Sequence, residues 1–399
     1  MTIFADIWRL PGPGGFVQEV ARLARGGQHV LAIVPKYVAE ESEYSDALAV
    51  AILNELGESR RVFPNAKVGG LAGAFGFEVS DDFDRYPTTV PELINHVDVV
   101  GRTFVCNTRD LDPAHLAELP TFLSRLDDES RPVPRTDRGT MIFILSSDLV
   151  PHDAESVATA RLWYWDRVAR WDVAALLASQ TSWHRVSGVL GEVRLETIIE
   201  IARWDFILAL DIAHEWTHDE FELSVILDRH AANVPASTVV RRTAQKEPPE
   251  LNLTAWDQGL VEAWHGEPGY KPATLPSTDR RLERLLWSAQ ARVLLPWIEI
   301  RRVSIERLVL EKLGSRRMES AVRELATSYP GAEDDSTVVE IALLARIIAV
   351  RLGNAEPRLR TTARVLRDAR NKLAHLTPLP SGHLDRMISE CAWLDEVGG

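Results

Sequence analysis

The chain has 399 residues, so two or three domains are expected rather than one. Its 45% hydrophobic and 26% charged residues are typical of a globular protein with sizeable cores. A net charge of −13 excludes a protein that coats nucleic acid over its whole surface, but it leaves room for a local basic patch. The two cysteines, Cys106 and Cys391, lie far apart and indicate neither a disulfide framework nor a thiolate zinc site.

The amino-terminal residues, Met1–Asp6, carry neither a basic segment nor a long apolar core. No stretch of the sequence is long and apolar enough for a membrane span. We therefore expect a soluble, cytoplasmic protein without membrane contact.

The first half alternates short apolar runs with helical stripes. A buried strand is predicted in each apolar run, because these runs are short and end at Pro, Asn or Ser. A helix is predicted in each stripe of apolar residues spaced three and four apart. The runs lie in 29–34, 98–106 and 141–145, and the helical segments in 16–24, 44–56, 113–126 and 154–179. This alternation predicts an α/β fold with a mostly parallel sheet covered on both faces, over residues 1–180.

A glycine-rich turn, Leu10–Phe16, runs into the first of these helices and is a candidate phosphate loop. A working loop needs a Lys and a Ser or Thr after the glycines, and this chain has Phe16 and Val17 there. The second apolar run ends at Asn107, where an acid would hold Mg²⁺, and the nearest acid is Asp110. NTP hydrolysis and a bound cofactor are therefore not expected.

The order of these pieces resembles the AAA/STAND group of P-loop NTPases. It consists of a glycine-rich turn, a strand, a helix, a strand followed by Asp110–Pro113, a helix, and a strand ending in Ser146–Asp148. The resemblance implies an inactivated member of that group. The alternative is an unrelated α/β domain that contains a Gly-Pro turn.

A metal-site pattern lies in the middle of the chain. His214, Glu215 and His218 fit H-E-x-x-H, in which two histidines on one helix face bind zinc and the glutamate acts as a base. The residues that follow are acidic, and His230 comes twelve residues after His218 without the expected glycine turn. We therefore expect no metal and interpret 181–275 as a helical connector that ends in a Pro/Gly-rich linker.

Beyond the linker the sequence shows only helical periodicity. We predict an all-α bundle over 276–399, with helices at 282–313, 338–352, 359–376 and 384–394. Positive charge is concentrated there: 280–317 contains ten basic and four acidic residues, and 351–372 contains seven basic and two acidic. Such a patch suits contacts with phosphates, although many of these residues would also serve as ordinary solvated helix faces.

The third of these helices carries the segment Arg370-Asn371-Lys372-Leu373-Ala374-His375. A histidine can transfer a proton at neutral pH, and a guanidinium can stabilise the crowded phosphorane formed during RNA cleavage. No metal is needed, because RNA supplies its own nucleophile, the 2′-hydroxyl. Asn371 and His375 share a helix face, whereas Arg370 lies about 140° away from His375 on an ideal helix.

This segment resembles the RNxLAH form of the R-x4-6-H motif of HEPN domains. The Arg-rich helix before it, with Trp287, Gln290, Pro296 and Glu299, is also similar to that family. The resemblance covers about the last third of the chain. It implies a metal-independent endoribonuclease of a bacterial toxin or antiviral defence system, with its site built across a homodimer.

The resemblance also implies roles for three residues. Arg370 would orient and neutralise the scissile phosphate, His375 would be the acid/base, and Asn371 would fix the orientation of His375 or bind the phosphate. The expected partners are RNA, a second copy of the chain bound through the C-terminal helical domain, and other proteins of a defence system. The alternative is a non-enzymatic adaptor in which both halves serve protein–protein contact.

Overall fold

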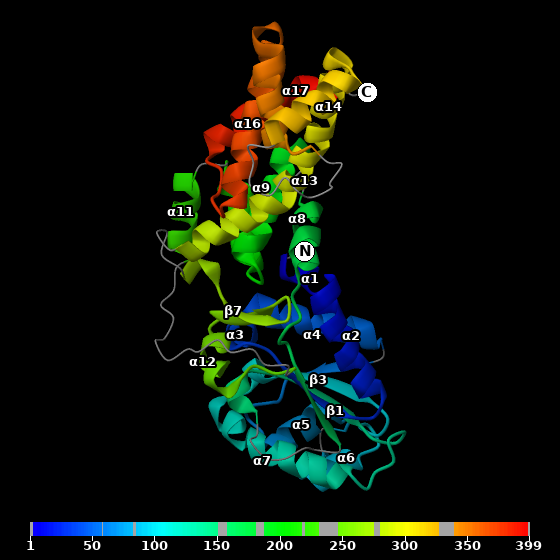
Figure 1. Ribbon diagram of the computed structural model, residues 1–399. Coiled ribbons are helices and arrows are strands. Elements are labelled where there is room, and N and C mark those ends of the chain that lie inside the picture. Colours follow the sequence, from blue (N-terminus) through cyan, green and yellow to red (C-terminus); the bar gives the residue numbers. More distant parts are fainter. Residues whose placement is uncertain are drawn as a thin grey trace. The chain divides into compact units, whose positions relative to one another are not determined.

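The computed structural model (Figure 1) describes residues 3–57, 59–82, 85–150, 158–180, 187–217, 220–230, 246–274, 280–326 and 339–397. The chain divides into two compact units. We call them the α/β unit (Met1–Ser179, Arg203–Phe206 and Ala232–Thr274) and the helical unit (Gln180–Ala202, Ile207–Ala231 and Leu275–Gly399). The connector expected at 181–275 is thus shared between the two units.

The α/β unit is built around a parallel five-stranded sheet. Its strands are β1 (His29–Ile33), β2 (Arg60–Val62), β3 (Thr103–Asn107), β4 (Thr140–Leu145) and β5 (Thr159–Trp163), in the order β2-β3-β4-β1-β5. The helices are α1 (Ile3–Ile7), α2 (Pro11–Arg25), α3 (Lys36–Glu40), α4 (Ser42–Leu56), α5 (Leu71–Val79), α6 (Val90–Ile94), α7 (Pro113–Ser130), α8 (Arg170–Ser179) and α12 (Leu253–Asp257). A separate antiparallel hairpin pairs β6 (Val261–Trp264) with β7 (Glu267–Tyr270).

Helices cover both faces of this sheet. Helices α2 and α4 contact each other and the central strands. On the other face, Phe143 of β4 contacts the stacked rings of Phe75 and Phe122, from α5 and α7. Strands β1 and β4 are buried along their whole length, as expected for parallel strands covered on both sides. The predicted α/β architecture and its three apolar strands are therefore confirmed.

Several features of the α/β unit differ from the prediction. The segment expected as one helix over 154–179 contains strand β5 and, separately, helix α8. Strand β5 pairs with β1 only, and its Arg161 is exposed, so it lacks the continuous apolar run that marks a central strand. The Pro/Gly-rich segment at 266–272 likewise includes β7, because a strand that pairs on one side only tolerates proline.

The glycine-rich turn is also not a loop between a strand and a helix. Gly12, Gly14 and Gly15 lie inside α2, which precedes β1. The backbone N–H of Gly12 donates to the carboxylate of Asp172 at 2.7 Å, so an anion of the chain itself occupies this position. A Cβ at Gly12 would lie 1.8 Å from the carbonyl oxygen of Arg167, so glycine is required by this close approach.

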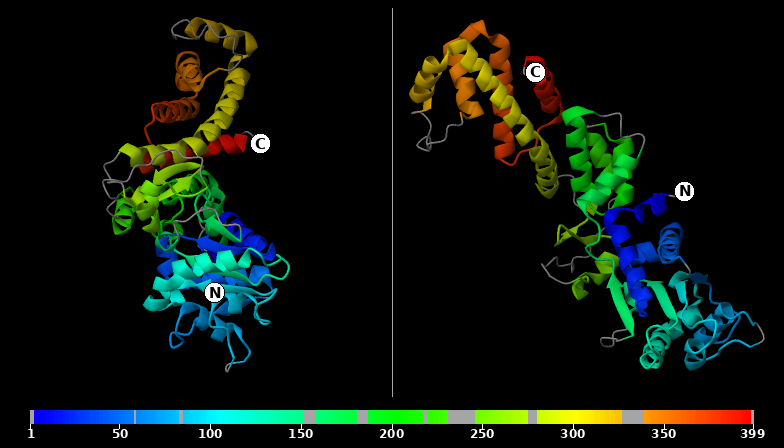
Figure 2. Two further views of the ribbon diagram at one scale, coloured as in Figure 1. Left: turned by 90° about the horizontal axis from the view of Figure 1, so that it is seen from below. Right: turned by 90° about the vertical axis from the view of Figure 1, so that its right-hand side faces the viewer.

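The helical unit is assembled along one long helix, α13 (Arg280–Leu313), which continues through Pro296 (Figure 2). Helices α9, α14, α16 and α17 contact α13. Its other elements are α9 (Gly188–Ala202), α10 (Phe206–Glu215), α11 (Glu220–Arg229), α14 (Ser315–Ala326), α15 (Ile341–Ile347), the π turn η6 (Ile348–Leu352), α16 (Pro357–Ala374) and α17 (Ser381–Val397).

One apolar core joins the carboxyl-terminal helices to α9. Leu294, Ile298 and Ile305 of α13 are buried in it beside Leu366 and Leu373 of α16. The helix-rich layout predicted for this region is confirmed, with α14 as an additional helix. Cys391 is buried in this core and Cys106 in β3, so neither thiol is exposed. Within the described ranges, no helix is both long and apolar enough to cross a membrane.

Candidate functional site

The RNxLAH segment lies where helix α16 ends. His375 is the C-cap residue, with φ −93° and ψ 20°, and Leu376 follows with a positive φ of 58°. The N–H of Leu376 donates to the carbonyl of Leu373 at 3.2 Å, and that of Thr377 to Lys372 at 3.0 Å. These two bonds form a Schellman motif, in which a left-handed residue closes the helix. His375 is thus the last residue on the helical path, at the carboxyl end of α16.

Two side chains of α13 hold the backbone around this helix end. Trp287 Nε1 donates to the carbonyl of Leu373 at 2.6 Å. The amide of Gln290 makes two bonds with the backbone of buried Leu379: it donates to the carbonyl at 2.9 Å and accepts from the N–H at 2.6 Å. The loop between α16 and α17 is therefore fixed at both ends. Trp287 and Gln290 are among the residues that carry the HEPN resemblance.

One exposed surface gathers four polar side chains, which we call the His375 face: Asn371, Lys372, His375 and His383. Asn371 and Lys372 lie about 40° and 60° to either side of His375 around the helix. The ammonium Nζ of Lys372 is 3.4 Å from Nε2 of His383, in the first turn of α17. Both histidines are exposed, while Asn371 and Lys372 are half-buried. The two ends of the α16–α17 loop thus contribute to the same surface.

Arg370 does not share this surface within one chain. Its guanidinium is 3.7 Å from the carboxylate of Glu340, the N-cap residue of α15, and its side chain is 42% exposed. This direction agrees with the separation of about 140° between Arg370 and His375 on the helix. Of the three predicted site residues, the structure therefore brings Asn371 and His375 together and places Arg370 beside an acid.

Positive charge continues along α16 from the His375 face. The helix carries six basic residues and one acid, Asp368, which pairs with Arg367 at 2.7 Å. Arg364 is exposed about three turns before His375, and Arg358 lies over the ring of Trp393 at 5.1 Å. Arg360 and Arg364, on the same side of α16 as His375, are exposed, and their charge complements the negative charge of a nucleic-acid backbone.

Sequence reasoning gave no role to Lys372 or His383. Lys372 lies inside the motif, but lysine is common in the last turn of any helix, so its position alone indicates no function. His383 follows Pro378 and Pro380 and belongs to no motif. Only the contact between the two residues, eleven positions apart in the chain, identifies them as neighbours.

The H-E-x-x-H pattern is not continued by a helix. His214 and Glu215 are the last two residues of α10, and His218 lies outside the described residues. Glu215 forms an ion pair with Arg229 at 2.5 Å, and Nε2 of His230 is 2.8 Å from Asp211. The part of the chain that the structure describes contains no cluster of three or more side chains arranged to hold a metal ion.

The carboxyl edge of the sheet in the α/β unit is occupied by the chain's own acids. Asp257 accepts hydrogen bonds from the N–H of Lys36 at 3.1 Å and from Ser147 Oγ at 2.5 Å. Asp148 accepts from Ser146 Oγ at 2.5 Å and pairs with Lys36 Nζ at 3.1 Å. Burial raises the pKa of Asp257. Ligands of open α/β sheets bind at this edge. Because Asp257 and Asp148 already accept the hydrogen bonds available there, little room is left for a bound anion.

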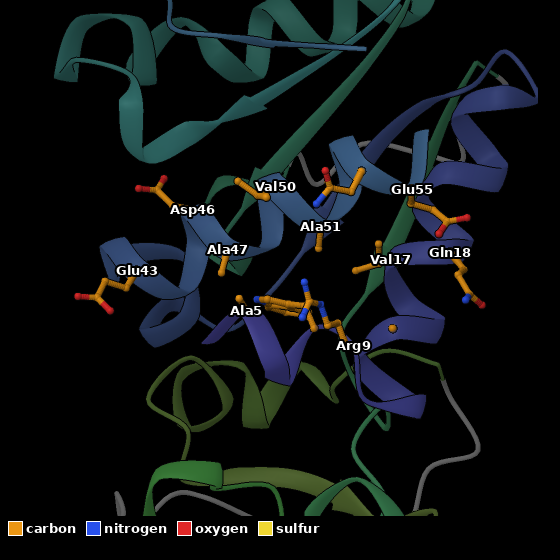
Figure 3. Close-up of a pocket in the computed structure, with 13 residues that line it drawn as sticks. Ala5, Arg9, Val17, Gln18, Glu43, Asp46, Ala47, Val50, Ala51 and Glu55 are labelled. Carbon is orange, nitrogen blue, oxygen red and sulfur yellow. The ribbon is translucent and has the colours of Figure 1, made fainter. Parts of the chain in front are cut away.

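The α/β unit also has an open pocket of about 630 Å³ between α1, α2 and α4. Figure 3 shows Arg9 opposite helix α4, which carries Glu43 and Asp46 toward one end and Glu55 toward the other. Asp46 is already paired with Arg61 at 2.6 Å. At least one acid that lines the pocket is thus already paired inside the α/β unit. The polar side chains of the pocket do not point toward one common position, so we do not interpret it as a reaction centre.

A comparison of the chain with protein-family models, with curated proteins and with solved structures finds no match. The function must therefore be inferred from the arrangement of the residues. The His375 face is the best candidate in the described chain, because its two histidines are exposed and the ammonium group of Lys372 lies beside one of them.

Proposed function

We propose that the protein is a metal-independent endoribonuclease of the HEPN type, acting as an effector in a bacterial antiviral defence or toxin system. One observation carries the proposal: exposed His375 and half-buried Asn371 share one face at the end of a basic helix. In this proposal the α/β unit is a degenerate NTPase-like sensor or docking module in the cytoplasm, bound by partner proteins of the system.

The proposed reaction uses the 2′-hydroxyl of RNA as the nucleophile, so that no metal or cofactor is required. His375 transfers a proton, which typically accelerates such a step 10²–10⁴-fold. The amide of Asn371 orients His375 or binds a phosphate oxygen. Arg370 neutralises the phosphate either after leaving Glu340 or by serving the site of a second copy, in a homodimer formed through the helical unit.

The test is cleavage of RNA by the purified full-length protein in EDTA. We expect products with 2′,3′-cyclic phosphate ends and a loss of about 10²–10⁴-fold in His375→Ala. Arg370→Ala should lose activity too, because its guanidinium no longer offsets the negative charge of the scissile phosphate. RNA with a 2′-deoxy substitution at the scissile nucleotide should stay intact, and His96→Ala in the α/β unit is the matched histidine control.

A second function is favoured by the ion pair between Arg370 and Glu340. If this pair is purely structural, the segment packs the helical unit and the protein is a non-enzymatic adaptor. The ribonuclease proposal fails if RNA stays intact both in EDTA and in cells expressing the protein, while Arg370→Ala and His375→Ala fold normally. Inhibition by EDTA would also contradict it and would direct attention to His214 and His218.

A further inference from the structure

We propose that His383 is the base of the cleavage reaction and Lys372 the cation at the scissile phosphate, so that His375 serves as the acid. This inference rests on the proposed ribonuclease function and names the residues that complete the site within a single chain. It starts from the contact between Lys372 and His383 on the His375 face.

Cleavage of RNA by its 2′-hydroxyl needs two proton transfers. One group must take the proton of the attacking hydroxyl, and another must give a proton to the departing 5′-oxygen. The two oxygens lie on opposite sides of the phosphorus, so two separate side chains perform the transfers best. The HEPN-like motif supplies only one histidine, and His383 is the second exposed histidine on the same surface.

The position of His383 suits a base. An ammonium group has only protons to donate, so the contact of 3.4 Å between Lys372 Nζ and His383 Nε2 uses the lone pair of a neutral imidazole. That lone pair is the one a base needs. His383 also lies in the first turn of the 17-residue helix α17, and exposed Arg386 lies one turn further along. The amino end of α17, Lys372 and Arg386 place positive charge beside His383, and Asp385 follows it by two residues.

The position of His375 suits an acid. It caps the carboxyl end of the 18-residue helix α16, where the partial negative charge of the helix lies. Asp368, two turns before it, lies about 20° from His375 around the helix and is paired with Arg367 at 2.7 Å. His375 thus lies at the carboxyl end of one helix and His383 at the amino end of the next, with Lys372 near both. Different surroundings of two titratable groups are how acid and base roles are commonly separated.

Lys372 links the two steps. It lies three residues before His375 on α16, so the two side chains are neighbours on the helix surface. When a phosphate enters, its non-bridging oxygen draws the ammonium of Lys372 away from His383 and frees Nε2. The cation then offsets the negative charge that develops on the phosphorane. Lys372 acts on the phosphate from the same chain, in addition to the cation that Arg370 supplies in the proposed function.

The reaction balances without a co-reactant. His383 Nε2 takes the proton from the 2′-hydroxyl, and the 2′-oxygen forms a bond to phosphorus. The bond between phosphorus and the 5′-oxygen breaks, and protonated His375 gives its proton to that oxygen. The products are a 2′,3′-cyclic phosphate and a 5′-hydroxyl.

The test compares two RNA substrates with the full-length protein. In one, the scissile 5′-oxygen is replaced by sulfur, which departs as a stable thiolate and needs little help from an acid. We expect His375→Ala to lose about 10²–10⁴-fold on ordinary RNA and to regain most of this loss on the sulfur substrate. His383→Ala should lose about as much on both substrates. Lys372→Ala should lose about 10-fold or more on both.

Several outcomes would overturn the proposal. If His383→Ala and His383→Asn cleave ordinary RNA within about threefold of the native chain while His375→Ala is inactive, His383 is not the base. If the sulfur substrate rescues His383→Ala instead of His375→Ala, the two roles are reversed. If the native chain cleaves neither substrate, the ribonuclease function itself fails, and this inference with it. Unchanged unfolding curves of the variants show that each chain is folded.

Discussion

Polar groups are paired with one another at the carboxyl edge of the sheet, whereas polar groups near the end of helix α16 are exposed. At the sheet edge, Asp257 accepts hydrogen bonds from Ser147 and from the backbone of Lys36, so the chain satisfies its own donors. At the end of α16, His375 and His383 are exposed and their neighbours are mostly cations. Polar groups that the fold has already paired stabilise it, whereas convergent exposed groups are available to a ligand. The comparison favours the helical unit as the place of the proposed cleavage reaction.

The histidines of the two units sharpen this comparison. His29 of β1 is fully buried: its Nδ1 accepts from the N–H of Met141 at 3.1 Å, so Nε2 carries the proton and donates to Ser130 Oγ at 2.9 Å. Burial, together with the positive charge of Arg138, lowers the pKa of His29 to about 3. His29 is thus a structural histidine, although its sequence context, an apolar strand, gives no sign of its hydrogen bonds.

The largest effect on stability is expected at His29. His29→Gln should lower the free energy of unfolding of the α/β unit by about 3 kcal/mol at pH 7, because it disturbs a buried hydrogen-bonded pair. RNA cleavage should change little, in contrast to His375→Ala. Urea unfolding followed by tryptophan fluorescence and the cleavage assay measure the two effects, and a parallel loss of cleavage would break the comparison.

The same variant gives a pH test. The folded protein keeps His29 neutral, whereas the unfolded chain binds a proton there below about pH 6.5. Stability from His29 is therefore complete above about pH 6.5 and is lost as the pH falls toward about 3. The stability advantage of the native chain over His29→Gln should shrink by up to about 1.4 kcal/mol per pH unit in this window. Unfolding curves whose separation is the same at pH 7, 6, 5 and 4 would contradict the role assigned to His29.

A smaller effect is expected at Gln290. Gln290→Leu leaves the N–H and carbonyl of buried Leu379 without their partner and should lower the free energy of unfolding of the helical unit by about 2 kcal/mol. It should also reduce RNA cleavage, because the loop that positions His383 relative to His375 is loosened. The same substitution at exposed Gln18 is the matched control and should change neither quantity. Full cleavage in Gln290→Leu would show that the loop need not be fixed.

The smallest effect is expected at Leu376. This residue is 57% exposed and holds a positive φ, which costs a side chain with a Cβ about 1 kcal/mol. Leu376→Gly should therefore raise the free energy of unfolding by about 0.5–1 kcal/mol, since glycine is the preferred residue at this position of a Schellman motif. Leu376→Ala keeps the Cβ and should give no such gain. Thermal unfolding of both variants checks the prediction.

Much of the fold could be predicted because it depends on local patterns. The apolar runs in β1, β3 and β4 are buried on both sides of a parallel sheet and so stand out as continuous hydrophobic segments. Helix α16 has the spacing and basic composition that predicted it, and Pro378 follows its end. Strands β2 and β5 were missed because they lie at the sheet edges, where short and partly polar sequences suffice.

By itself, the sequence determined the alternation of strands and helices, the basic character of the carboxyl-terminal third and the grouping of Asn371 with His375. These properties follow from periodicity and from spacing within one helix. Only the tertiary structure decided that Arg370 turns toward Glu340, that Asp257 fills the sheet edge and that Lys372 meets His383. Each of these contacts joins residues from different elements, and their distance in space depends on packing and loop closure, which spacing along the chain does not encode.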